Sequence, residues 1–498
     1  MASFYVENFG CRATQADGAA LERQFRERGL ERAIAASQAQ VVVLNTCTVT
    51  AAADQDARAA IRRIRRQNPA CQILVTGCYA QRAPEEVATL PGVTQVIGNS
   101  HKNELVNIAL PRSWAEPNGE GIDCEGRTTK DEGRVFVSDI FAHTELLAAP
   151  VFEAANERTR PNLKVQDGCD NRCSFCVIPF VRGQSRSLPL NQILNEVRAL
   201  VEAGYREVVI SGINLGRWGR DLTAIPQSPA PACNSLSSRP QHSLPLAEGN
   251  AKWRDLALHG RLCFEHLIRA ILDETSLEKL RISSVEPMDW SDELIRLVAE
   301  SPRIAKHAHV PMQTASDRIL RLMHRRYRPW HYREKIEKIH AAMPTAAIGA
   351  DVMVGFPGET DADFEQTRAM VDAMPFTYLH VFTYSARPGT PAASMRNQVP
   401  VRIARERNRI LRELAGKKHN AFMQSFVGGT IEAITLRSSV ARAFPSTLAP
   451  DQAPPAITEC LTDNYLKLHL RGSHEPNRWL QARVEGIEDG ALVGSQGN

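Results

Sequence analysis

Short apolar runs alternate with amphipathic stretches through the first hundred residues. The apolar runs predict strands over 5–9, 40–45 and 72–76, and the amphipathic stretches predict helices over 19–28 and 51–66. The second helix is ended by Asn68-Pro69, a pair that does not continue a helix. Alternation of this kind is typical of a parallel sheet with crossover helices. An α/β domain is therefore expected over residues 1–112.

The same alternation resumes near residue 160 and continues to about residue 400. It predicts strands over 207–211, 279–284, 307–310, 348–354 and 378–384, with helices such as 190–203 and 361–373 between them. Repeated βα units predict a full or partial (β/α) barrel, whose active face lies at the C-terminal strand ends. Residues 225–250 are rich in Pro, Ser, Ala and Gln and predict a flexible surface insertion. The barrel domain is assigned to residues 155–400.

Two segments flank this barrel. Residues 113–154 lose the alternation around the breaker cluster 117–121, so we interpret them as a linker, with one strand over 135–140 crossing between domains. Residues 401–424 predict a single basic helical connector. Beyond it, short strands over 465–470 and 479–484 predict a small antiparallel barrel over residues 425–495.

Composition places the chain among ordinary soluble proteins. It has 498 residues, enough for two to four domains, with 43% hydrophobic and 23% charged residues. No apolar run reaches the roughly 18 residues of a membrane helix, and the N-terminus lacks the basic start and apolar stretch of a signal peptide, so a cytoplasmic protein is expected. A net charge of +4 is too small to indicate what kind of partner the chain binds, and the basic runs 62–66 and 325–328 are interpreted as solvated helix faces.

Eleven cysteines are many for a cytoplasmic chain, where disulfides are disfavoured and clustered cysteines indicate metal or redox chemistry. Cys169, Cys173 and Cys176 form a C-x3-C-x2-C triplet. Three thiolates so close together can hold three irons of a [4Fe–4S] cluster and leave the fourth iron open. The alternative is zinc, which commonly requires a fourth ligand that the sequence does not offer nearby.

A second group of cysteines is dispersed along the chain. Cys11, Cys47 and Cys78 each follow a predicted strand closely. Because parallel strands end at one shared edge of the sheet, these thiols are expected to converge there and to bind a second cluster. Three inert buried thiols are the alternative. The other cysteines are interpreted as isolated thiols: Cys71, Cys124, Cys233, Cys263 and Cys460.

The C-x3-C-x2-C triplet before a βα barrel resembles the radical S-adenosylmethionine superfamily. Two cysteine triplets in this order, followed by a small barrel, resemble the methylthiotransferases, with an RNA-binding TRAM domain at the C-terminus. The resemblance covers nearly the whole chain. Within this family the stretches 45–50, 76–81, 164–170 and 178–187 look most like the threonylcarbamoyladenosine branch.

This resemblance implies an activity: adding a methylthio group to C2 of N6-threonylcarbamoyladenosine at position 37 of transfer RNA. It implies two [4Fe–4S] clusters and S-adenosylmethionine, which one cluster cleaves to a 5′-deoxyadenosyl radical while the other binds sulfur. Isopentenyladenosine in transfer RNA and a ribosomal-protein aspartate remain alternative targets, and a non-catalytic iron–sulfur RNA-binding sensor is a remote alternative. Expected partners are an anticodon stem-loop, an electron donor such as flavodoxin and a sulfur source. We expect a monomer that does not contact a membrane.

The resemblance also implies contacts beyond the cysteines, and no catalytic side chain other than the cluster ligands. The adenosylmethionine contacts would be Phe175, Ser211, Gly212, Asn214, Ser284, Glu286, Gln313, Asp351 and Gly355. The RNA contacts would be Lys467, Arg478 and Trp479. Ordinary turns and core packing are the alternatives for these positions.

The chain departs from the family pattern in three places. Thr14 stands where the family favours Asn, Ala315 replaces a Gly near the cofactor loop, and an insertion follows Asp221. None of these changes removes an expected cluster ligand.

Overall fold

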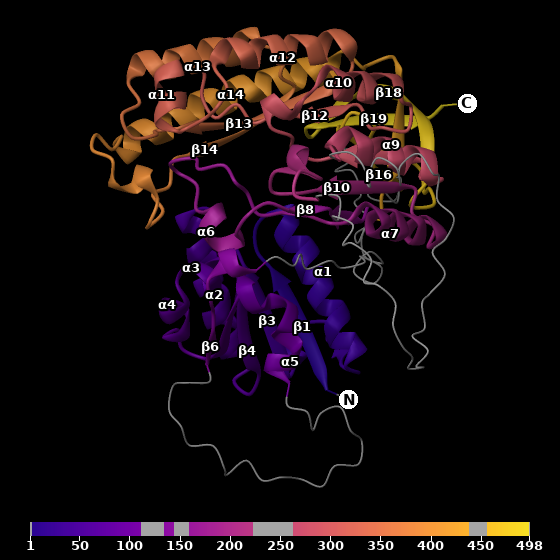
Figure 1. Cartoon of the computed structure of the whole chain (residues 1–498). Coiled ribbons are helices and arrows are strands. Elements are labelled where there is room, and N and C mark those ends of the chain that lie inside the picture. Colours follow the sequence, from indigo (N-terminus) through magenta and orange to yellow (C-terminus); the bar gives the residue numbers. More distant parts are fainter. Residues whose placement is uncertain (1, 111–133, 144–158, 223–261, 438–455, 498) are drawn as a thin grey trace, which may run out of the picture.

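The computed structural model describes residues 2–110, 134–143, 159–222, 262–437 and 456–497. The predicted insertion 225–250, most of the predicted linker 113–154, Cys124 and Cys233 lie outside the described residues. An N-terminal α/β domain, a central half-barrel and a small C-terminal barrel follow one another along the chain (Figure 1).

The N-terminal domain is a parallel sheet with the strand order β2-β1-β3-β4-β5-β6. All six residues of β3 are buried, as expected for a parallel strand covered on both faces. Helix α2 covers one face and helices α1 and α5 the other. The elements are β1 (Ser3–Asn8), α1 (Arg12–Glu27), β2 (Glu31–Arg32), β3 (Val41–Thr46), α2 (Ala51–Gln67), β4 (Gln72–Gly77), α3 (Cys78–Arg82), α4 (Pro84–Ala88), β5 (Val93–Gly98), α5 (Leu105–Ala109) and β6 (Val135–Phe136).

Two predictions for this region were wrong in detail. Helix α1 begins at Arg12 rather than at residue 19, because its first turns bury small and charged side chains such as Asp17 and therefore carry no apolar periodicity. The predicted strand over 135–140 is shorter, and in the described residues β6 pairs only with β5, so it closes the N-terminal sheet instead of crossing to the barrel.

The central domain is a half-barrel of two parallel three-stranded sheets, β7-β10-β11 and β12-β13-β14. Bridges between Leu280 and Ile304 and between Ser284 and His309 join them. The strands are β7 (Asn162–Lys164), β10 (Glu207–Ser211), β11 (Lys279–Ile282), β12 (His307–His309), β13 (Ala347–Val354) and β14 (Tyr378–Thr383). The hairpin β8 (Gln166–Asp167) and β9 (Arg186–Ser187) flanks helix α6 (Ile178–Arg182). The outer helices are α7 (Leu190–Glu202), α9 (Phe264–Glu274), α10 (Asp292–Glu300), α11 (Asp317–Leu322), α12 (Pro329–Ala342) and α13 (Asp361–Ala373).

Helix α14 (Val401–Gln424) leads from β14 into the closed C-terminal barrel. This barrel has the order β15-β16-β17-β19-β18, and its β17–β19 pair is parallel, so the predicted barrel is not antiparallel throughout. Its strands are β15 (Thr430–Thr435), β16 (Ile457–Thr462), β17 (Lys467–Arg471), β18 (Trp479–Glu488) and β19 (Ala491–Gln496). Within the described residues, no helix has the length and apolarity needed to cross a bilayer.

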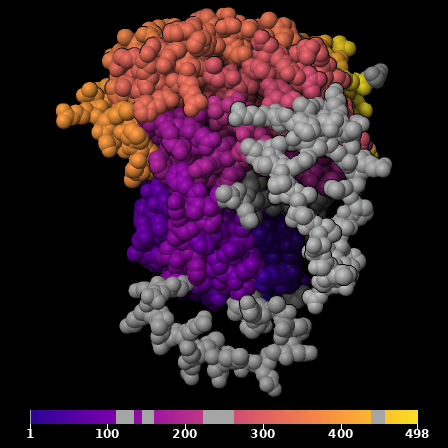
Figure 2. Space-filling view, viewed as in Figure 1, coloured from indigo at the N-terminus to yellow at the C-terminus, as the bar shows by residue number. Residues whose placement is uncertain are grey.

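The three parts meet around the inside of the half-barrel. In the view of Figure 2 the N-terminal domain, in indigo, lies below the half-barrel. Arg387, beyond β14, donates to Asp54 of α2 at 2.8 Å. From the C-terminal barrel, Tyr465 accepts a hydrogen bond from Arg12 at 3.1 Å, and its ring lies 4.7 Å from that of His307.

Candidate functional site

The N-terminal cysteines converge at one edge of the sheet. Cys11 follows β1, Cys47 follows β3, and Cys78 begins α3 directly after β4. A Cβ on Gly10 would lie only 2.8 Å from the Cys47 sulfur, and this glycine has a φ of +99°. Glycine is therefore required where the first loop approaches Cys47. Burial, followed by the charge of Cys78, raises the pKa of Cys47 to about 12.

The second triplet lies in the loop between β8 and α6. The Asn171 amide donates to Cys169 at 3.4 Å, and the Arg325 guanidinium donates to Cys173 at 3.4 Å. Burial, followed by the charge of Cys173, raises the pKa of Cys176 to about 12. The two triplets are close neighbours. Cys78 packs against Val177 and Val181, and Val177 directly follows Cys176 at the start of α6.

Both triplets fit iron–sulfur clusters. The nine described cysteines are all free thiols. Burial raises the pKa values of Cys47, Cys169 and Cys176, so a bound cation is needed to displace the protons of these three thiols. In neither triplet do the three sulfur atoms all lie within 4.8 Å of one another. A single zinc ion would hold its sulfurs roughly 3.8 Å apart at a Zn–S distance of about 2.3 Å. Each thiolate of a cubane binds a different iron, which requires a wider spacing, so this geometry counts against zinc.

A buried charge network lies between the two cysteine sites. Arg182 of α6 donates to both oxygens of Asp167, at 3.0 and 2.9 Å, and to Asp17 of α1 at 3.0 Å. Lys102 donates to Asp17 at 3.1 Å, and Lys164 donates to Asp167 at 2.9 Å and also to Asp17. All five side chains are at least nine-tenths buried. The network therefore joins the N-terminal domain to the half-barrel.

Three cations and two carboxylates leave this network with one excess positive charge. Burial disfavours the ionised form of Asp17, but Lys102, Lys164 and Arg182 outweigh that effect and hold its pKa well below the usual range. Thiolates at Cys78 and Cys11 would interact favourably with Arg182. The network also borders a polar cavity of about 310 Å³ between the two domains. Its excess charge can therefore stabilise anionic sulfur at the N-terminal site.

The turn after β10, where an adenosylmethionine contact is predicted, lies against the second triplet. Asn214 donates from its side chain to Cys169 at 3.7 Å and from its backbone to Gln166 Oε1 at 2.7 Å. A Cβ on Gly212 would lie 2.8 Å from that same oxygen. Ser211 is buried, and its hydroxyl has no hydrogen-bond partner within the described part of the chain.

Four of the predicted adenosylmethionine contacts lie on or after later strands of the half-barrel. Ser284, Glu286, Gln313 and Asp351 follow or lie on neighbouring strands of the half-barrel. Gln313 is 7% exposed with a φ of 63°, and its side-chain oxygen accepts no hydrogen bond from any described residue. A buried acceptor of this kind is suited to a bound ligand. Glu286 forms an ion pair with Arg325.

Phe175 and Gly355 also have structural roles. The Phe175 ring meets Phe356 edge-on at 6.4 Å. A Cβ on Gly355 would lie 2.5 Å from the Cβ of Ala404, so this glycine lets α14 pack against the turn. The Gly355 amide donates to Glu359 at 2.7 Å.

The interpretation of the basic run 325–328 as a solvated face was wrong for its first residue. Arg325 is 7% exposed and contacts Cys173, Glu286 and the Tyr327 ring. The charge network around Asp17 was likewise not predicted. The only signal was indirect, since Lys164, Asp167 and Arg182 lie in the stretches that carry the family resemblance.

The three residues expected to bind RNA differ in their surroundings. Lys467 is exposed on β17. Arg478 is paired with Glu475 at 3.0 Å. Trp479 is half-buried, with the Lys279 ammonium 4.8 Å above its ring, and so helps to join the C-terminal barrel to the half-barrel.

Two family models match the N-terminal domain and the half-barrel of this chain. The family model described as "Uncharacterized protein family UPF0004" matches residues 3–98, and the model "Radical SAM superfamily" matches residues 163–216 and 256–371. Among solved structures, the radical S-adenosylmethionine methyltransferase TsrM from Kitasatospora setae aligns with a TM-score of 0.48 and 16% identity, over 79% of this chain and 75% of that one.

Curated relatives match over almost the entire chain. The threonylcarbamoyladenosine tRNA methylthiotransferase MtaB of Aquifex aeolicus is 32% identical over 96% of this chain and 99% of its own length. MtaB of Bacillus subtilis is 32% identical over 95% and 92%. A tRNA-2-methylthio-N(6)-dimethylallyladenosine synthase from Novosphingobium aromaticivorans is 31% identical over 87% of both chains. With two family models matched and a relative 32% identical over 96% of this chain, the chain belongs to the radical S-adenosylmethionine methylthiotransferase family.

Proposed function

We propose that this enzyme adds a methylthio group to C2 of N6-threonylcarbamoyladenosine at position 37 of transfer RNA. The observation that carries the proposal is the match to the A. aeolicus and B. subtilis MtaB enzymes, which covers 96% and 95% of this chain. The match to a dimethylallyladenosine synthase favours one second candidate, the same chemistry on an isopentenyl-type adenosine.

In this proposal Cys169, Cys173 and Cys176 hold one [4Fe–4S] cluster, and Cys11, Cys47 and Cys78 hold another. When bound, the first would supply the electron that cleaves S-adenosylmethionine, and the second would carry the sulfur that is transferred.

The chain's own side chains orient and shield these groups. Arg325 and Asn214 donate toward Cys173 and Cys169, which fixes the direction in which the loop presents its sulfurs. Arg182 supplies buried positive charge beside Cys78 and Cys11. Tyr465 fills the inside of the half-barrel from the C-terminal barrel, so water is kept from that end.

The remaining assignments are part of the same proposal. The substrate would be an anticodon stem-loop, whose exposed bases proteins recognise by stacking and edge contacts, with Lys467, Arg478 and Trp479 as candidate contacts. A flavodoxin-like donor would supply electrons and a separate source would supply sulfur. The enzyme would act in the cytoplasm as a monomer.

Two cysteine variants test the division of labour. Cys173→Ala should abolish release of 5′-deoxyadenosine from adenosylmethionine under anaerobic reducing conditions. Cys47→Ala should retain that release but form no methylthio product on transfer RNA. Cys263→Ala, which changes a cysteine outside both triplets, is the matched control and should leave both reactions intact. About eight irons per chain are expected in the reconstituted enzyme and about four in each triplet variant.

The substrate is tested by mass spectrometry of transfer RNA nucleosides. Transfer RNA that carries only threonylcarbamoyladenosine should gain the methylthio group, whereas transfer RNA that carries only isopentenyladenosine should not. The reverse pattern would transfer the proposal to the second candidate. Product formed by the Cys47→Ala variant would show that the assigned roles of the two triplets are wrong.

A further inference from the structure

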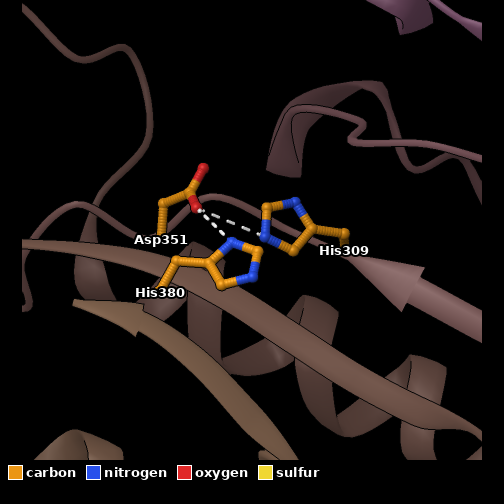
Figure 3. A group of neighbouring side chains, drawn as sticks. All are labelled: His309, Asp351 and His380. Carbon is orange, nitrogen blue, oxygen red and sulfur yellow. Dashed lines mark hydrogen bonds and ion pairs between the residues drawn. The ribbon is translucent and has the colours of Figure 1, made fainter. Parts of the chain in front are cut away.

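Three metal-ligating side chains meet inside the half-barrel, away from the cysteines. His309 comes from β12, Asp351 from β13 and His380 from β14 (Figure 3). Alternate residues of these strands, such as Ala308 and Ala350, pack in the core beneath the helices. Because successive side chains of a strand point to opposite faces, the three residues point into the lumen. The register places Asp351 directly opposite His380.

The donor atoms are spaced as around one ion. A carboxylate oxygen of Asp351 lies 3.4 Å from His309 Nε2 and 3.2 Å from His380 Nδ1, and all three donor atoms lie within 4.8 Å of one another. Metal–ligand distances of about 2.1 Å give polyhedron edges of roughly 3.0 Å for an octahedron and 3.4 Å for a tetrahedron. The two shorter separations match these edges, and the group is the only one of its kind among the described residues.

Hydrogen bonding alone does not account for the arrangement. His380 makes a hydrogen bond to Asp351, whereas His309 Nε2 is held to the same carboxylate only by an ion-pair contact of 3.4 Å and makes no hydrogen bond within the described chain. The His309 side chain is 9% exposed. A cation at the centre of the group would coordinate this buried nitrogen directly.

The rings are held in place while one side stays open. The Tyr378 ring is stacked on that of His309, with ring centres 5.9 Å apart and an angle of 16° between the planes. The His380 side chain is 62% exposed and that of Asp351 is 26% exposed. Further ligands can therefore reach the centre of the group from the lumen.

We propose that His309, Asp351 and His380 bind a divalent first-row transition-metal ion, separate from the iron of the cysteine sites. Two imidazoles and one carboxylate form a facial set of ligands that leaves coordination positions open. These positions face the same lumen as Ser284, whose backbone is bridged to that of His309, so they can take an oxygen ligand such as water or a substrate carboxylate or carbonyl.

Manganese(II) is the probe, because it prefers oxygen and nitrogen ligands to thiolates and its free form has a strong EPR signal. The reconstituted enzyme, with its clusters oxidised and EPR-silent, is washed with a chelator and titrated with Mn²⁺. We expect one tight site per chain. His380→Ala and Asp351→Asn should weaken it at least tenfold at unchanged iron content, and excess Zn²⁺ should displace the bound Mn²⁺.

His331→Ala, at an exposed histidine of α12, is the matched control and should bind like the wild type. His380 is mostly exposed, so its variant tests the site even if a change at buried His309 disturbs folding. Absence of a stoichiometric Mn²⁺ site in the wild type, or an affinity that is unchanged in both the His380 and Asp351 variants, would overturn the proposal and leave a hydrogen-bonded His–Asp–His group.

Discussion

Replacing Asp17 by Asn should weaken the contact between the N-terminal domain and the half-barrel, and should lower the melting temperature more than a substitution of an exposed ion-pair residue does. Asp17 accepts from Lys102, Lys164 and Arg182, and all four side chains are at most 4% exposed. The amide keeps the size of the carboxylate but removes its charge. Lys164 and Arg182 retain Asp167, whereas Lys102 keeps only the neutral oxygen of Asn45.

The expected magnitude follows from this geometry. Removing one partner of a buried ion pair destabilises a protein by about 3–5 kcal/mol, since the opposite charge stays buried without compensation. For an unfolding unit of roughly 150–250 residues, each kcal/mol corresponds to about 2–4 °C in the midpoint. The Asp17→Asn variant should therefore melt roughly 6–20 °C below the wild type.

Calorimetry at matched iron content measures this difference, with Glu27→Gln as the control on the same helix. Glu27 is paired with Arg23 at 2.6 Å, but the two side chains are 57% and 42% exposed. Exposed pairs contribute about 0.2–1 kcal/mol, so this control should shift the midpoint by only a few degrees at most. If the two variants melted within about 2 °C of each other, the network would not carry the domain contact and the reasoning would be refuted.

Two further predictions concern pH and RNA. Burial raises the pKa of Glu196 from 4.5 to about 7, so the folded state binds this proton more tightly than the unfolded state, and the stability gained from the bound proton is lost as the pH rises between these two values. The Glu196→Gln variant should therefore melt at the same temperature as the wild type near pH 4 and at a higher temperature near pH 8. A difference in melting temperature that does not depend on pH would contradict this. The Phe180 ring is 48% exposed and meets Phe141 edge-on at 6.5 Å, beside Arg172 of the cysteine loop. Because stacking on a base contributes about 1–3 kcal/mol, Phe180→Ala should weaken binding of the anticodon stem-loop about 5- to 150-fold, measured by fluorescence anisotropy. Trp330→Ala, at a residue 57% exposed on the outer helix α12, is the control and should not weaken binding; equal effects of the two variants would show that RNA does not bind specifically at the Phe180 surface.

The strands and both cysteine triplets could be predicted because their signals are local or follow from sheet geometry. The apolar run of β3 is buried on both faces, and residues after parallel strands share one edge. The C-x3-C-x2-C spacing needs no tertiary information. Strand β10 and helix α13 have the predicted bounds, since in each the periodic pattern ends where the element ends.

The charge network and the histidine group could not be predicted in the same way. Asp17 and Lys164 are 147 positions apart, and a charged residue in a helix normally indicates a solvated face. Asp351 was predicted as a cofactor contact, but its neighbours His309 and His380 come from other strands. Such contacts depend on strand register and domain docking, which local periodicity does not contain.

The contacts of Tyr465 limit how the C-terminal barrel can be exchanged between related proteins. It holds a φ of 71°, which is strained for a residue with a side chain, between β16 and β17, where it meets Arg12, Arg281 and His307. The barrel is therefore part of the chamber wall and is not a module on a tether. If the barrel of a relative were joined to this chain at α14, the contacts of Tyr465 would be lost unless the relative's β16–β17 turn had an equivalent tyrosine. Chimeras between relatives should therefore be active only when this turn and the N-terminal domain come from the same protein.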